Sequence, residues 1–147
     1  MSENNSPGNK KPLFVIDPAP TIRWPVEVTL PVDGGETVTY QFTGIFNRLS
    51  NEALDALLGV DADTNLESLV KEQKENPKRA QEVLRENAEI FPKLLVGWED
   101  VKTSDGKSFP FSVSALQQHV TGPNGTFLSI GIWRAVNEIR SGARLGN

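Results

Sequence analysis

The stretch WPVEVTLPVDGGETVTYQFTGIF, Trp24–Phe46, gives the clearest indication of the fold in this chain of 147 residues. Apolar and polar residues alternate in two runs, a period that is typical of strands with one buried face. The apolar positions are Val26, Val28, Leu30 and Val32 in the first run and Val38, Tyr40 and Phe42 in the second. Between the runs lies Asp33-Gly34-Gly35, whose residue types accept the positive φ of a tight turn. We predict a β-hairpin that must lay its apolar face on other elements, because two strands alone are marginally stable.

The chain before the hairpin changes character near residue 13. Residues 1–12 are mostly Asn, Ser, Gly, Lys and Pro, so we expect a disordered tail with little apolar surface to bury. Leu13–Ile16 is a short apolar run compatible with a strand, and the prolines of Asp17–Pro20 predict a turn or an extended linker. We expect residues 13–147 to form a single domain, since this length suits one core.

Helical spacing replaces the strand pattern after the hairpin. Ser50 is a capping residue before Leu54, Leu57 and Leu58, and this helix is expected to end near Gly59. A second helix is predicted from the capping box of Thr64 and Glu67, with Leu66, Leu69 and Val70 on its inner face.

A third helix is predicted from Asn76-Pro77, which places a capping residue before a proline at the first helical position. Its inner face is expected to hold Ala80, Val83, Leu84 and Ala88 and to continue through Phe91, Leu94 and Leu95 to Trp98, with an interruption at Pro92. Farther on, Ser112 caps a short predicted helix that carries Leu116 and Val120 and ends at Gly122-Pro123. Thr126 is the expected cap of a last helix with an apolar stripe at Leu128, Ile132, Ala135, Val136 and Ile139. The predicted architecture is α+β: an N-terminal β-hairpin followed by a mainly α-helical cluster.

Composition excludes several classes of function. The formal charge of -4 has the wrong sign for a protein that binds nucleic acid by neutralising phosphates. The absence of cysteine removes disulfides, thiolate metal sites and thiol nucleophiles, and it fits a reducing compartment. Neither a signal peptide nor an apolar run of about 18 residues occurs, so we expect a cytoplasmic protein without a membrane segment.

Catalytic and metal-binding patterns are equally scarce. The chain has one histidine, His119, which we interpret as a surface or core-edge residue. Glu99 and Asp100 are adjacent and point in different directions on a regular element, and the glycines form no phosphate-binding loop. The charged stretch Lys71–Glu86 mixes both signs at helical spacing, which is typical of a solvated helix face. We therefore expect a protein that is not an enzyme and that has no metal or cofactor.

The stretch VGWEDVKTSDGKSFPFS, Val96–Ser112, surrounds an Asp-Gly turn with three large aromatic residues. Pro110 favours an extended backbone from Phe109 to Phe111, so Trp98 and the two phenylalanines are predicted to pin both ends of a polar loop. These three residues and Trp133 are the candidate site: each is either a structural anchor of the core or an exposed hot spot for a partner. Trp24 carries the same two interpretations.

The same stretch resembles the tail assembly chaperones of long-tailed bacteriophages. The pattern is a small residue, Trp, acidic residues and Val, a polar Asp-Gly turn, and an apolar residue followed by Pro, Phe and Ser before a helix. The matching positions are Gly97, Trp98, Glu99, Asp100, Val101, Asp105, Gly106, Phe109, Pro110, Phe111 and Ser112. The order of a hairpin followed by an acidic helical region is also similar to that family.

The resemblance implies a non-enzymatic chaperone in the host cell cytoplasm. It would bind the tape measure protein during tail morphogenesis, form at most a weak homo-oligomer, and be absent from the mature virion. Members of the family also occur in a longer, frameshifted form that recruits tail tube protein. Three alternatives stay open: a virion structural protein such as a head–tail connector or tail terminator subunit, an inhibitor of a host enzyme, and an enzyme. The first of these predicts a stable ring that is retained in particles.

Overall fold

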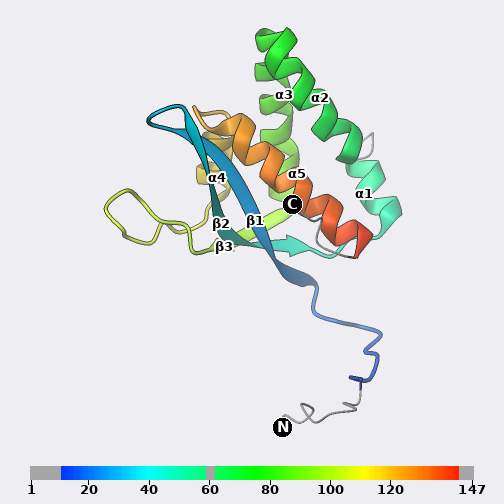
Figure 1. Ribbon diagram of the computed structural model, residues 1–147. Helices are drawn as coiled ribbons and strands as arrows, with labels where there is room; N and C mark the ends of the chain where they lie inside the picture. The colour runs from blue at the N-terminus through cyan, green and yellow to red at the C-terminus, as the bar shows by residue number, and fades with distance from the viewer. Residues whose placement is uncertain (1–10, 59–61, 143–147) are drawn as a thin grey trace.

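The computed structural model describes residues 11–58 and 62–142, the side chains of residues 62–68 excepted, and it has an α+β fold (Figure 1). Three antiparallel strands form one sheet in the order β1-β2-β3, with helices packed against it. The strands are β1 (Thr21–Val32), β2 (Glu36–Asn47) and β3 (Leu95–Glu99). The helices are α1 (Asn51–Leu58), α2 (Ala62–Glu75), α3 (Pro77–Ile90), α4 (Val113–Val120) and α5 (Gly125–Ser141), and the single 3-10 turn is η1 (Phe91–Lys93). The predicted fold class is confirmed.

The predicted hairpin is present, with β1 and β2 paired from Thr21↔Asn47 to Val32↔Glu36. The turn has Gly34 at φ 91° and Gly35 at φ 83°, and such positive values favour glycine. Only the half of the hairpin farther from its turn is buried, where Val26, Val28 and Phe46 join the core. Toward the turn, Val38 and Tyr40 are 39% and 51% exposed. The apolar face of the hairpin is therefore longer than the core that covers it.

The third strand corrects the predicted helix that was to continue through Phe91, Leu94 and Leu95 to Trp98. The helix α3 ends at Ile90, and the 3-10 turn η1 contains Pro92, which lacks the amide hydrogen needed to continue a helix. Leu95 then pairs with Phe46 of β2 and is fully buried. A short run of apolar residues is compatible with either a strand or a helix. Here it forms a strand, because it pairs with the side of β2 that β1 leaves free. The sheet therefore has one strand more than the sequence pattern indicated.

The last helix, α5, is the centre of the molecule. It lies along β1 on one side and packs against α2, α3 and α4 on others (Figure 1). A side chain in place of Gly131 would meet the carbonyl oxygen of Glu27, so the glycine permits close contact between α5 and β1. The buried surface is wider than the predicted stripe, because Ser129 and Asn137 are also buried.

Most predicted helix starts are confirmed by capping hydrogen bonds. The hydroxyl of Ser50 accepts from Ala53 N at 3.0 Å, and that of Ser112 accepts from Ala115 N at 2.9 Å. The side chain of Asn76 accepts from Arg79 N at 3.4 Å, directly before Pro77. The predicted cap of the last helix is wrong, because α5 begins one residue before Thr126. The hydroxyl of Thr126 instead donates to Gln73 of α2 at 2.9 Å.

The second predicted helix needs two corrections of detail. The helix α2 begins at Ala62, two residues before the predicted cap Thr64, whose side chain lies outside the described residues, as do Gly59 and the side chains of Leu66 and Glu67. Leu69 is buried as expected, whereas Val70 is 42% exposed. The helix therefore turns a narrower face to the core than predicted.

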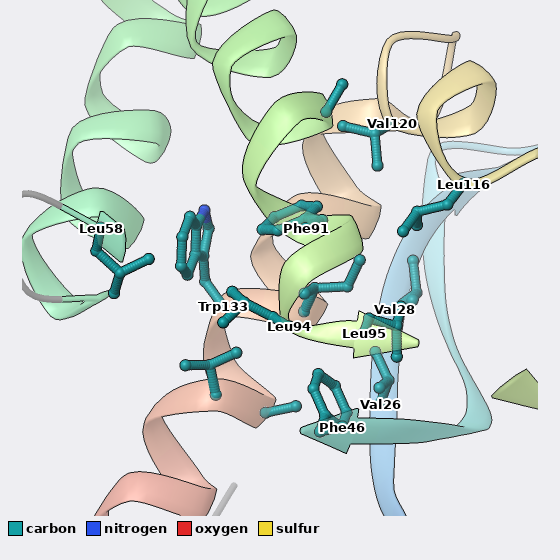
Figure 2. Packing of buried hydrophobic residues seen from close by; sticks show 14 of the residues in the cluster. Val26, Val28, Phe46, Leu58, Phe91, Leu94, Leu95, Leu116, Val120 and Trp133 are labelled. Carbon is teal, nitrogen blue, oxygen red and sulfur yellow. The ribbon is translucent and has the colours of Figure 1, made fainter. Parts of the chain in front are cut away.

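The segment before β1 is not a strand. Leu13–Ile16 has no regular secondary structure and pairs with no strand in the described residues, so the strand interpretation is wrong. All four side chains are exposed. Residues 1–10 of the predicted tail lie outside the described ranges. The buried core begins with the hairpin, and Figure 2 shows its residues from β1, β2, η1, β3, α4 and α5 converging around Phe91, Leu95 and Trp133.

Candidate functional site

An aromatic cluster forms around Trp98 and holds three of the four predicted site residues. Its members come from β2, β3, the loop after β3 and α4. The ring of Trp98 contacts Phe111 edge-on at 4.9 Å, stacks on Phe109 at 6.2 Å and meets the edge of Phe42 at 6.1 Å. Phe109 also contacts His119 at 5.5 Å between ring centres. Offset and edge-on pairs of this kind are the favoured arrangements of aromatic rings.

The Trp98 ring also ties the end of the loop to the sheet by a hydrogen bond. Its Nε1 donates to the carbonyl oxygen of Phe109 at 2.8 Å. Within the loop, Phe109 N donates to Val101 O at 2.8 Å, so the two chain segments of the loop run side by side at its base. These contacts agree with the prediction that the aromatic residues pin both ends of the loop, although the first end is a strand and not a helix.

The polar tip of the loop is held by its own hydrogen bonds. The Asp105 carboxylate accepts from the hydroxyl of Thr103 and from Lys107 N at 3.3 Å. The hydrogen bond from Thr103, and then that from the Lys107 amide, lowers the pKa of Asp105 below its ordinary value. Gly106 follows at φ 84°, the positive value that the Asp-Gly turn predicts. The tip is a defined turn that carries no aromatic residue.

The cluster is only partly covered. Trp98, Phe109 and Phe111 are each half-buried, and so is Phe42. Tyr40, two residues before Phe42 on β2, lies on the same face of the strand and is 51% exposed. We name these five residues, Tyr40, Phe42, Trp98, Phe109 and Phe111, the aromatic band. Ring contacts with Trp98 link Phe42, Phe109 and Phe111, and Tyr40 continues the same face of β2 toward the turn of the hairpin.

The fourth predicted site residue, Trp133, lies apart from the band. It is fully buried on α5 and contacts Phe91 at 5.0 Å between ring centres (Figure 2). In this fold it is a structural anchor and presents no surface to a partner. Trp24 is half-buried, and its Nε1 donates to the carboxylate of Glu138 at 2.7 Å, which joins β1 to α5. Trp24 thus also has a structural role, in the contact between β1 and α5.

Sequence reasoning did not place Tyr40 and Phe42 in the candidate site. Both were assigned to the inner face of the hairpin, because strict alternation does not show where the covering layer ends. The available signal was length: strands of 12 residues exceed the usual five or six, so part of such a hairpin extends beyond a small core. An exposed tyrosine on an apolar face is a second signal of a binding surface.

Comparison of the chain with protein-family models, with characterised proteins and with solved structures gives no match. The function must therefore be argued from the residues and the geometry.

The described residues contain no cluster of side chains typical of a metal centre. No group of three or more His, Asp or Glu among them is placed to hold a metal ion. Glu99 forms an exposed ion pair with Arg23 at 3.0 Å. In residues 11–58 and 62–142 no helix is long and apolar enough to cross a membrane. Three of the four candidate site residues thus lie in the aromatic band, a partly exposed surface.

Proposed function

We propose that this chain is a tail assembly chaperone of a long-tailed bacteriophage that binds the tape measure protein through the aromatic band. The observation that carries the proposal is that the residues of the family-like pattern, Trp98, Phe109 and Phe111, are gathered on a partly exposed apolar surface. Residues that served the core alone would be covered, as Trp133 is. The resemblance of Gly97–Ser112 to that family supplies the identity of the client.

The chemistry of the band suits an amphipathic helical client. Such a helix presents an apolar stripe that docks on a complementary apolar surface, and aromatic residues dominate the binding energy of such contacts. Tape measure proteins are long and helical in the family concerned, so several copies of the chaperone would bind along one client. Weak individual contacts then add through multivalency. In the longer form of the family, recruitment of tail tube protein would be a second activity.

The test is co-expression of the chain with the tape measure protein of its own genome, followed by affinity capture and a measurement of soluble client. Tyr40→Ala is the informative variant, because Tyr40 is exposed and its truncation leaves the core intact. Val70→Ala on α2 is the matched control, an exposed apolar residue outside the band. We expect the wild type and Val70→Ala to solubilise the client and Tyr40→Ala to capture it about tenfold less well, since removing an interface aromatic commonly costs 1–2 kcal/mol or more.

A client that is equally insoluble with and without the chain would contradict the proposal. Equal capture of the client by Tyr40→Ala and by the wild type would show that the aromatic band is not the binding surface.

The alternative is a virion structural protein, such as a head–tail connector or tail terminator subunit. The sheet favours it in one respect: β3 is the last strand in the sheet order, and its outer side pairs with no strand in the described residues. Such an edge can join subunits by strand addition. Mass spectrometry of purified virions separates the two functions, because the chaperone is expected to be absent from mature particles and the structural protein to be retained.

A further inference from the structure

A short apolar segment before the hairpin is exposed to solvent. We name Leu13–Ile16 the apolar arm: its side chains are 91%, 87%, 59% and 84% exposed in chain order. Single exposed apolar residues are ordinary, but four large ones in succession form a patch of the kind that marks an interaction site. The arm extends away from the body of the molecule (Figure 1).

The base of the arm is fixed to the body. The carbonyl oxygen of Pro20 accepts from Arg48 N at 2.9 Å, directly before β1 begins. Between the arm and this point lie Asp17, Pro18 and Ala19. Proline fixes its own φ and restricts the residue before it to extended conformations, so this spacer holds the arm off the body.

A pocket of suitable chemistry lies close to the base of the arm, between the end of β2, α1 and the C-terminal half of α5. It encloses about 210 Å³. Its floor includes the buried side chains of Phe46, Leu54 and Val136. Its rim includes Leu49, which is 41% exposed, together with Arg48 and Arg140. The pocket is therefore lined by apolar side chains and by two arginines, of which Arg140 forms an ion pair with Asp55 at 2.7 Å.

The arm and the pocket match in size and in charge. A dry apolar cavity of about 150 Å³ holds a benzene molecule, so a pocket of this volume has room for the phenyl ring of Phe14. Asp17 follows Phe14 by three residues, so it can lie up to roughly 10 Å from an inserted ring along an extended chain. There its carboxylate would meet Arg48, which forms no ion pair with another described residue.

We propose that the apolar arm of one copy of this chain binds the pocket of a second copy, with Phe14 as the inserted side chain. Binding within the same chain would require the arm to fold back beside Arg48, to which its own base is fixed. That reversal would have to be completed within the three residues Asp17–Ala19, and in the structure the arm instead points away from the body (Figure 1). Reciprocal exchange of two arms gives a closed dimer with two-fold symmetry, and exchange in one direction gives a ring or a chain.

The experiment measures mass against concentration by sedimentation, using the full chain. Phe14→Ser removes the inserted ring, and Leu49→Asp places a carboxylate at the apolar part of the rim. Each is expected to raise the dissociation constant about tenfold to a hundredfold, the loss that follows from exposing one large apolar side chain. Val38→Ser is the matched control, an exposed apolar residue of the hairpin that should leave self-association unchanged.

Mixing the two variants tests the pairing directly. Phe14→Ser keeps an intact pocket and Leu49→Asp keeps an intact arm, so together they should form a mixed assembly more tightly than either forms alone. A wild type that stays monomeric while Phe14 is protected from solvent would show binding within one chain and overturn the proposal. Unchanged association of either variant, or association that appears only with the tape measure protein, would also overturn it. Capture of that client by Phe14→Ser shows separately whether the proposed function holds.

Discussion

Replacing Trp98 by alanine tests whether the aromatic band also supports the fold. Truncation of a fully buried Trp costs about 3–5 kcal/mol, and the half-buried ring of Trp98 should lose about half of that. The loss of the hydrogen bond from its Nε1 to Phe109 O adds about 1 kcal/mol. Lost edge-on contact with Phe111 adds a similar amount. We expect Trp98→Ala to lower the free energy of unfolding by about 3.5–4.5 kcal/mol.

Urea denaturation followed by circular dichroism measures this change, and the midpoint should fall without a change in slope if only stability is altered. In a thermal melt the same loss is a decrease of about 7–18 °C for a domain of this size. Trp98→Phe is the control, because it keeps an aromatic ring while losing the N–H donor and part of the indole, for which we expect about 1–2 kcal/mol. A loss below about 1 kcal/mol for Trp98→Ala would refute the argument, since the band would then contribute little to stability. Equal losses for both variants would attribute the effect to the hydrogen bond and the part of the indole that phenylalanine lacks.

Three further predictions follow from single contacts. Gly131→Ala should destabilise the protein by about 1–3 kcal/mol in a thermal melt, because the added Cβ would meet Glu27 O. Helix propensity alone predicts that alanine stabilises the helix, so increased stability would contradict the close contact between α5 and β1. Ser112→Ala should cost about 0.5–2 kcal/mol in urea denaturation through loss of the α4 cap, and an unchanged midpoint would argue against that cap. By NMR the carboxyl of Asp105 should show a pKa below the ordinary value of an aspartate, and its stabilisation is present above the unfolded pKa and lost as the pH falls through the lowered folded pKa. Thr103→Val should return that pKa toward the ordinary value, whereas an unchanged titration would remove the Thr103 hydroxyl as the cause.

The secondary structure was predictable wherever the signal was local. The alternation from Val26 to Phe42 predicted the hairpin, and Asp33-Gly34-Gly35 predicted its turn, because both depend on backbone preferences of neighbouring residues. Ser50, Asn76 and Ser112 predicted helix starts for the same reason, since a capping side chain bonds to an amide two or three residues away.

The strand β3 could not be predicted in this way, because it depends on pairing with a segment distant in the sequence. Nothing in Leu95–Glu99 distinguishes a strand from the end of a buried helix until β2 offers an unpaired side. The reverse error occurred at Leu13–Ile16, where a strand-like composition finds no partner in the described residues and stays exposed. In both cases the deciding factor was the presence or absence of a neighbour distant in the sequence.

The candidate site likewise has a part that local sequence predicts and a part that depends on packing. The sequence by itself determined that Trp98, Phe109 and Phe111 flank one polar turn, because Pro110 and Asp105-Gly106 control the local backbone. Only the tertiary structure decided that these three residues gather with Phe42 on a partly exposed surface while Trp133 is fully buried. Local preferences are encoded in adjacent residues, whereas burial depends on which elements cover a side chain, and that is settled by packing across the whole chain.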